Sequence, residues 1–183
     1  DLVERNPSCN YIGVDIKGAR LWKGAKYAEE HGLKNVGFVR TRIEFIESLF
    51  APGEVSEIWI TFADPQIGRE KKRLTAPLFM NRYRNFLKPG GIVHLKTDSR
   101  YLHEYSIAMA RQNDLKILAY GTDIYGEDRE QLYASELSSV SGRSAIDALF
   151  EVQTFYESQY LAQGFPITYL AFLADHSGDY ISP

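Results

Sequence analysis

Three carboxylates stand where short apolar segments of strand length end. Asp15 closes one such segment, and Asp64 and Asp98 each follow another. The carboxyl ends of parallel strands meet at one edge of a sheet, and ligands bind there. A carboxylate at that edge can accept hydrogen bonds from a ribose, hold an ammonium group or orient a nucleobase. The same residues can instead cap a helix or a turn, so residue type alone leaves both interpretations open.

A run of basic residues follows Asp64 closely. The chain carries a net charge of −3, yet residues 67–100 hold nine basic and two acidic side chains, a local charge of +7. The remainder of the chain is therefore at −10, and an acidic body with one basic segment indicates a local contact with a polyanion. A solvated helix face would give the same pattern. The position beside Asp64 favours phosphate contacts by Arg69, Lys71, Lys72 and Arg73.

Strand-like and helix-like segments alternate along the chain. The apolar runs predict strands over 10–16, 36–39, 57–62, 91–97, 116–120 and 167–173. Helical periodicity and end signals predict helices over 18–31, 43–50, 77–87, 101–113 and 144–163. This order is typical of an open α/β sheet with helices on both faces, whose early strands are buried on both sides. We expect the last strand to pair antiparallel, and residues 121–144 to form a surface loop or a lid.

The composition fits a single domain over residues 1–183. Cys9 stands alone, which excludes an internal disulfide, and His and Cys spacing for a metal is absent. We therefore expect a cytoplasmic protein without a metal, and no apolar run is long enough to span a membrane. The opening residues 1–7 resemble the tail of a helix. The expectation is an N-terminally incomplete domain that lacks the first strand and the Gly-rich turn after it.

With these positions placed, the sequence resembles the bacterial tRNA (guanine-N7)-methyltransferase family over nearly its whole length. The resemblance rests on motif order rather than on any one residue. Its motifs are Gly13-Val14-Asp15, Phe62-Ala63-Asp64-Pro65 with the basic run after it, Pro89-Gly90-Gly91 followed by Thr97-Asp98, and Thr154-Phe155-Tyr156-Glu157.

The resemblance implies a fold, a reaction and a set of site residues. The fold is a Rossmann-like class I methyltransferase sheet, the cofactor S-adenosylmethionine, the substrate tRNA, and the assembly a monomer or homodimer. Asp64 is implied as the catalytic residue, and the cofactor-binding residues are Asp15, Thr41, Arg42 and Asp64. The implied substrate-binding residues are Arg69, Lys71, Lys72, Arg73, Asp98, Thr154 and Glu157.

The chain departs from the family pattern at several positions. Ala63 replaces the usual Pro and Gln66 the usual Trp, and Ile67-Gly68 precedes the basic run. Thr41 occupies the place of the acid that reads the adenine. Three alternatives stay open: a class I methyltransferase for another RNA position or a small molecule, a nicotinamide-dependent reductase, and a noncatalytic RNA-binding module. The reductase lacks a Tyr-x-x-x-Lys pair, and methyl transfer to mapped tRNA separates the others.

Overall fold

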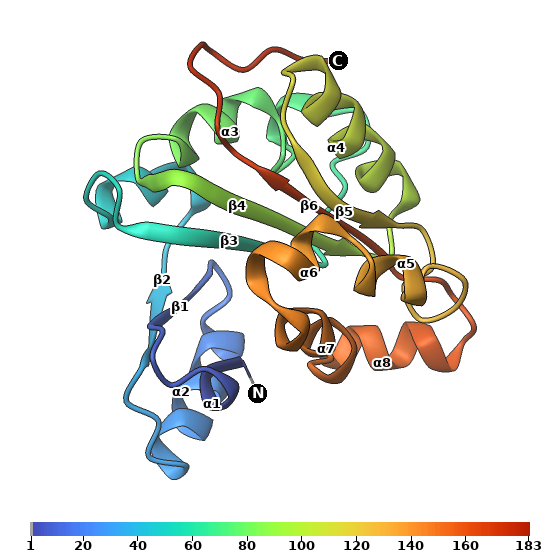
Figure 1. Cartoon of the computed structure of the whole chain (residues 1–183). Helices are drawn as coiled ribbons and strands as arrows, with labels where there is room; N and C mark the ends of the chain where they lie inside the picture. The colour runs from blue at the N-terminus through green and yellow to red at the C-terminus, as the bar shows by residue number, and fades with distance from the viewer. Residues whose placement is uncertain (1) are drawn as a thin grey trace. The chain divides into compact units, whose positions relative to one another are not determined.

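The computed structural model describes residues 2–183, which divide into two compact units. The first unit ends at Leu49 and the second runs from Phe50 to Pro183. Each unit is described by itself, and the prediction of one domain over the whole chain stays a prediction. All six predicted strands are present (Figure 1).

The first unit is a two-stranded parallel sheet with a helix packed on both strands. After the short helix α1 (Leu2–Arg5), β1 (Tyr11–Asp15) pairs with β2 (Val36–Arg40), and Asp15 lies opposite Arg40. The helix α2 (Gly18–Glu30) connects the strands, and the 3-10 helix η1 (Ile43–Leu49) follows them.

Glycine lets α2 approach β2 closely. A Cβ at Gly24 would lie 2.6 Å from the Phe38 ring, so a larger residue would push the helix off the strand. The sheet is nevertheless not covered on both sides as expected from the sequence. Ile12 of β1 is 47% exposed, because α2 is the helix that packs on this sheet within the described residues.

The second unit is a four-stranded mixed sheet in the order β3-β4-β6-β5. The strands β3 (Val55–Thr61) and β4 (Leu87–Thr97) are parallel, while β6 (Thr168–Leu173) is antiparallel to both β4 and β5 (Ile117–Gly121). The antiparallel pairing of the last strand is therefore confirmed. This strand lies between two others and not at an edge.

Helices cover this sheet on two sides (Figure 1). On one side lie α3 (Pro77–Tyr83) and α4 (Arg100–Gln112), preceded by the 3-10 helix η2 (Glu70–Lys72). On the other side, α5 (Arg129–Tyr133), α6 (Glu136–Ser141) and α7 (Arg143–Glu151) pack through one apolar cluster. Members of that cluster include Ile92, Leu132, Leu137, Ile146 and Tyr169.

Three segments differ from the sequence prediction. The helix predicted to reach residue 87 ends at Tyr83, since Leu87 already pairs with Val55 as the start of β4. The segment 121–144 contains α5 and α6 in place of an irregular loop. The single helix predicted over 144–163 is α7 and α8 (Phe155–Ala162), because Thr154 and Glu157 form a capping box that starts a new helix.

A buried histidine lies in the centre of the second sheet. The His94 ring stacks on Trp59 with 3.9 Å between centroids, and its Nδ1 lies 2.7 Å from the Tyr169 hydroxyl. Its Nε2 lies 3.3 Å from a carboxylate oxygen of Glu57. Burial lowers the pKa of His94 below its usual value, although Glu57 acts in the opposite direction. Burial likewise lowers the pKa of His103.

We predict that acid destabilises the protein below about pH 6.5, the ordinary pKa of histidine. There the unfolded chain takes up protons that the folded His94 and His103 do not, so the unfolding free energy falls by at most about 1.4 kcal/mol per pH unit for each group. Urea unfolding between pH 8 and 5.5 measures this slope. The lowered pKa of Glu57 keeps its own titration below this window.

A matched pair of variants tests the assignment to the buried ring. His94→Gln should reduce the slope, while His31→Gln, at an exposed position in the first unit, should leave it unchanged. An equal slope in wild type and His94→Gln would contradict the assignment.

Candidate functional site

Two carboxylates lie at adjacent strand ends in the second unit. In the parallel pair β3 and β4, Thr61 lies opposite Lys96, and the backbone N–H of Phe62 donates to the Lys96 carbonyl at 2.9 Å. Asp64 follows shortly after β3 and Asp98 directly after β4. Both carboxylates are exposed at this edge. The placement of the two acids agrees with the sequence analysis.

The backbone around Asp64 is strained. Phe62 and Gln66 have φ angles of 50° and 49°, in the left-handed region that non-glycine residues rarely adopt. Such residues cost about 1–3 kcal/mol each and persist where surrounding structure enforces them, often at functional sites. Asp64 contributes locally, since its Oδ1 accepts a hydrogen bond from the Gln66 N–H at 2.9 Å. The loop therefore presents the Asp64 carboxylate in one conformation.

A buried arginine holds the same loop from below. Arg73 is 0% exposed, and its Nε donates to the Pro65 carbonyl at 3.2 Å. Its guanidinium lies 4.5 Å from the ring centroid of Tyr101 and 4.2 Å from that of Tyr105, both on α4. One Nη also donates to the Tyr101 hydroxyl at 2.6 Å.

This burial corrects the predicted role of Arg73. A side chain without accessible surface does not reach an external phosphate, so Arg73 is a structural anchor of the loop that carries Asp64. The sequence analysis grouped it with its neighbours because it ends a run of basic residues. The other three, Arg69, Lys71 and Lys72, are exposed.

A second buried charge fixes the end of β4. Lys96 Nζ lies 2.5 Å from Oε1 of Glu157 and 2.5 Å from the Leu149 carbonyl, and neither charged side chain is more than 4% exposed. The Tyr125 hydroxyl donates to the same Glu157 oxygen at 2.7 Å. Burial lowers the pKa of Lys96, while Glu157 acts in the opposite direction. We call this contact the Lys96–Glu157 pair.

Thr154 and Glu157 are engaged with each other at the start of α8. Thr154 Oγ1 accepts from the Glu157 N–H at 3.1 Å, and Glu157 Oε2 accepts from the Thr154 N–H at 3.2 Å. Both carboxylate oxygens of Glu157 thus have partners inside the protein. Their predicted contact with a substrate stays a prediction. Sequence reasoning missed Lys96, although a lysine inside an apolar strand is a signal for a buried partner.

The first unit brings Asp15 and Thr41 together. Asp15 Oδ1 accepts from the Lys17 N–H at 2.9 Å, and Oδ2 lies 3.5 Å from Arg20. The Thr41 N–H donates to the Asp15 carbonyl at 3.2 Å, while Thr41 Oγ1 donates to the Arg42 carbonyl at 3.3 Å. The Arg42 side chain is exposed. These residues stand at the ends of two parallel strands, as the sequence predicted.

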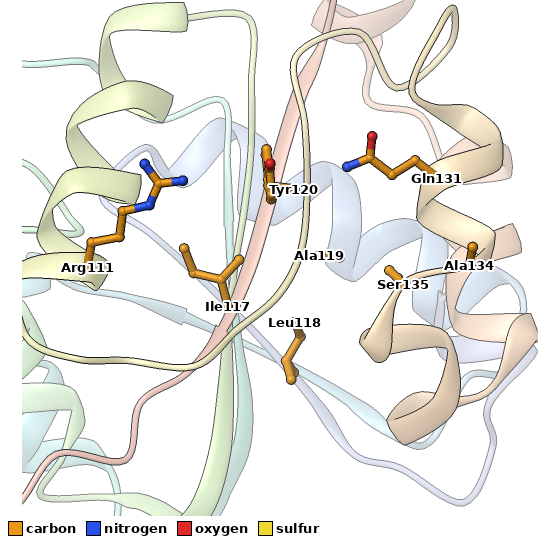
Figure 2. A pocket seen from close by; sticks show the side chains of 8 residues that line it. All are labelled: Arg111, Ile117, Leu118, Ala119, Tyr120, Gln131, Ala134 and Ser135. Atoms are coloured by element: carbon orange, nitrogen blue, oxygen red, sulfur yellow. The ribbon is translucent and has the colours of Figure 1, made fainter.

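A cavity of about 380 Å³ lies elsewhere, along β5 (Figure 2). Figure 2 shows Arg111 of α4 and Gln131 of α5 on opposite sides of this strand. None of the predicted site residues line the cavity. Its wall consists of Arg111, Ile117, Leu118, Ala119, Tyr120, Gln131, Ala134 and Ser135. Among the described residues no cluster of His, Cys, Asp or Glu could hold a metal, and no helix is long and apolar enough to cross a membrane.

Comparison with known proteins decides the family. A family described as putative methyltransferase matches residues 1–135. The tRNA (guanine-N(7)-)-methyltransferase of Christiangramia forsetii is 50% identical over 94% of this chain and 71% of its own length. Those of Bacteroides thetaiotaomicron and Porphyromonas gingivalis are 44% and 40% identical over 94% and 100% of this chain, and 62% and 69% of their own lengths. The chain belongs to the tRNA (guanine-N7)-methyltransferase family.

Solved structures agree with this family at the level of fold. The chain superimposes on the 16S rRNA methyltransferase KamB with a TM-score of 0.63 at 14% identity, over 100% of this chain and 81% of KamB. The [4+2]-cyclase SpnF gives a TM-score of 0.58 at 16% identity, over 96% of this chain and 71% of SpnF. A geranyl diphosphate methyltransferase in complex with SAM gives 0.52 at 15% identity, over 96% of this chain and 73% of that protein.

The comparisons confirm the family resemblance read from the motifs, with the reaction and cofactor that it implied. They also confirm a mixed α/β methyltransferase fold with an open sheet. This member of the tRNA (guanine-N7)-methyltransferase family spans about 62–71% of the length of the three relatives. The roles of individual residues are therefore argued from the geometry above.

We predict that the Lys96–Glu157 pair is essential for the stability of this family member. Lys96→Met leaves a buried carboxylate without its cation and should lower the unfolding free energy by about 3–5 kcal/mol. Lys96→Met/Glu157→Leu removes both charges and should recover a large part of that loss. Urea unfolding measures each value.

The control is Arg100→Met, which breaks the exposed pair that Arg100 forms with Glu104 at 2.8 Å. It should cost no more than about 1 kcal/mol. An equally small loss in Lys96→Met would show that the buried pair does not hold β4 against α8.

Proposed function

We propose that the protein containing this chain transfers a methyl group from S-adenosylmethionine to N7 of a guanine in tRNA, and that Asp64 is its catalytic carboxylate. Family membership supports the reaction, and the exposed, conformationally fixed Asp64 at the end of β3 is the observation that carries the residue assignment. A substrate of this kind implies a cytoplasmic enzyme.

The residues of the first unit fit one part of the cofactor. Asp15 offers a carboxylate at the end of a parallel strand, where it can accept hydrogen bonds from both ribose hydroxyls. Thr41 and Arg42 follow the neighbouring strand, so they are assigned to the adenosine side of the cofactor. S-adenosylmethionine supplies an electrophilic methyl group on a positively charged sulfur.

The chemistry makes positioning the main task of the protein. N7 of guanine carries an unprotonated lone pair at neutral pH, so methyl transfer requires no general base. What the protein must do is hold the nucleophile in line with the methyl group. Positive charge moves onto the guanine during the reaction, and a fixed carboxylate nearby stabilises that charge. Asp64 is suited to this role because its loop cannot relax freely.

The exposed bases beside Asp64 supply the contact with the RNA backbone. Arg69, Lys71 and Lys72 are assigned to phosphates, because they are exposed in the segment that follows the catalytic loop. Asp98 is assigned to the substrate base. Thr154 and Glu157 are assigned a supporting role on the substrate side, through the start of α8.

The first experiment measures transfer of labelled methyl from S-adenosylmethionine to unmodified tRNA by the full-length protein, followed by strand cleavage at 7-methylguanosine. Cleavage at one guanine is the expected result. Methylation at another position would instead indicate a different RNA methyltransferase. Binding of tRNA without methyl transfer would identify a noncatalytic relative.

Asp64→Asn should reduce methyl transfer by about 10²–10³-fold, because it removes a preorganised charge. The amide oxygen can still accept from Gln66, so the loop is kept. Glu130→Gln, which neutralises an exposed carboxylate on α5, should keep wild-type activity. Turnover of Asp64→Asn at the wild-type rate would refute the assignment.

The basic segment should separate into two kinds of residue. Replacing Arg69, Lys71 and Lys72 by Gln should weaken tRNA binding and flatten its dependence on salt, with the slope of log K against log [salt] changing by up to about 0.9 per lost phosphate contact. Arg73→Lys should leave the slope unchanged and lower kcat, since its guanidinium positions the Asp64 loop without reaching the RNA.

Affinity measured between 50 and 200 mM salt tests both parts. An unchanged slope in the triple variant would exclude the three exposed residues as phosphate contacts. A changed slope in Arg73→Lys would contradict its position inside the protein.

A further inference from the structure

A cavity of about 300 Å³ opens beside Asp98 in the second unit. Asp98, Tyr160, Phe165 and Pro166 line it. The pairing of β4 with β6 brings these residues together, since Thr97 lies opposite Thr168 and the Thr168 hydroxyl donates to the Thr97 carbonyl at 2.8 Å. The residue after β4 and the loop before β6 therefore stand side by side. The helix α8 contributes Tyr160 to the wall.

Two aromatic rings form the apolar part of the wall. Tyr160 and Phe165 are arranged edge to face, with centroids 6.2 Å apart and planes at 80°. Tyr160 packs against the core cluster with one side, so its ring is held in place. Phe165 is 53% exposed, which is unusual for a phenylalanine in a loop without a partner. Exposed aromatic surface of this kind stacks with nucleobases, whatever their sequence.

The polar part of the wall is a carboxylate that is free to accept hydrogen bonds. Asp98 is exposed, and within residues 2–183 no group donates a hydrogen bond or an ion pair to its side chain. An ionised carboxylate has two acceptor oxygens and no donor. It therefore fits a flat ring that presents two neighbouring N–H donors. Guanine has this arrangement at N1 and N2, whereas adenine, cytosine and uracil each place an acceptor beside the donor.

The wall is rigid because the Lys96–Glu157 pair joins its two sides. Lys96 precedes Asp98 by two residues on β4, and Glu157 lies one turn before Tyr160 on α8. The direct contact at 2.5 Å fixes the distance between the acceptor and the aromatic ring. A site that reads a base needs such preorganisation, since a misplacement of about 1 Å has a large effect on rate.

We infer that this cavity holds the target guanine, with Tyr160 and Phe165 as stacking partners and Asp98 as the acceptor for N1–H and N2–H. The inference rests on the proposed function and adds the residues that select the base. N7 lies on the opposite edge of guanine from N1 and N2. A base bound in this way therefore directs its nucleophile out of the cavity. Extrusion of the base from the RNA makes both faces available for stacking.

The first test replaces the aromatic wall in the full-length protein. Tyr160→Leu/Phe165→Leu should lower kcat/KM for methyl transfer to tRNA by about 10–100-fold, as expected for loss of base stacking, and leave the affinity for S-adenosylmethionine unchanged. Tyr160→Phe should restore activity, because the ring is kept. Tyr120→Leu, which removes an aromatic ring from the separate cavity along β5, should behave as wild type.

The second test uses a tRNA with inosine in place of the target guanosine. Inosine keeps N7 and N1–H and lacks the 2-amino group. Wild type should methylate this tRNA at least about tenfold more slowly, because one hydrogen bond to the carboxylate is lost. Asp98→Asn should be slower on guanosine and should show a smaller difference between the two substrates.

The outcomes separate the two levels of the proposal. Absence of methyl transfer to guanosine by wild type would overturn the proposed function itself. Normal wild-type activity together with wild-type kcat/KM in Phe165→Leu and in the double variant would overturn only the assignment of the cavity. Loss of cofactor affinity in these variants would place the cofactor there, and unchanged discrimination in Asp98→Asn would assign the cavity to a neighbouring base. Phe165 is exposed, so its single variant removes little from the core.

Discussion

The ion pair between Lys96 and Glu157 constrains the second unit more than any other contact. A buried charge is stable only when a partner of opposite sign and further hydrogen bonds replace its water. Lys96 finds these in Glu157 and the Leu149 carbonyl, and Glu157 finds a further donor in Tyr125. The pair can therefore form in only one arrangement of β4, α7 and α8. A core of apolar side chains alone would tolerate small displacements between these elements, which a methyl-transfer site could not.

Buried and exposed charges have separate tasks in the proposed site. Arg73 and Lys96 are hidden, and each fixes a segment that carries an exposed carboxylate, Asp64 in one case and Asp98 in the other. Arg73 achieves this for a loop whose backbone is locally unfavourable at Phe62 and Gln66. The strain is thus balanced by a guanidinium between two tyrosine rings. The neighbouring Arg69, Lys71 and Lys72 are left free to bind.

The sequence predicted the strands well and the roles of charged residues poorly, for physical reasons. Every strand coincides with a continuous apolar run, a signal that depends only on local composition. The break between α7 and α8 also had a local signal, the capping box at Thr154 and Glu157, which the helical periodicity on both sides concealed. Whether Arg73 is buried depends on tyrosines about 30 residues away in sequence. No local pattern distinguishes it from Lys72.

The direction of β6 explains why an acceptor and an aromatic loop meet at one edge. In a parallel sheet only the residues that follow strands reach the carboxyl edge. Because β6 runs antiparallel between β4 and β5, its entry loop arrives there instead, and Phe165 and Pro166 come to lie beside Asp98. The exit of one strand supplies the carboxylate and the entry of its neighbour supplies the stacking surface. Reversal of a single strand thereby gives this edge two chemically different walls, which a flat base with polar edges requires.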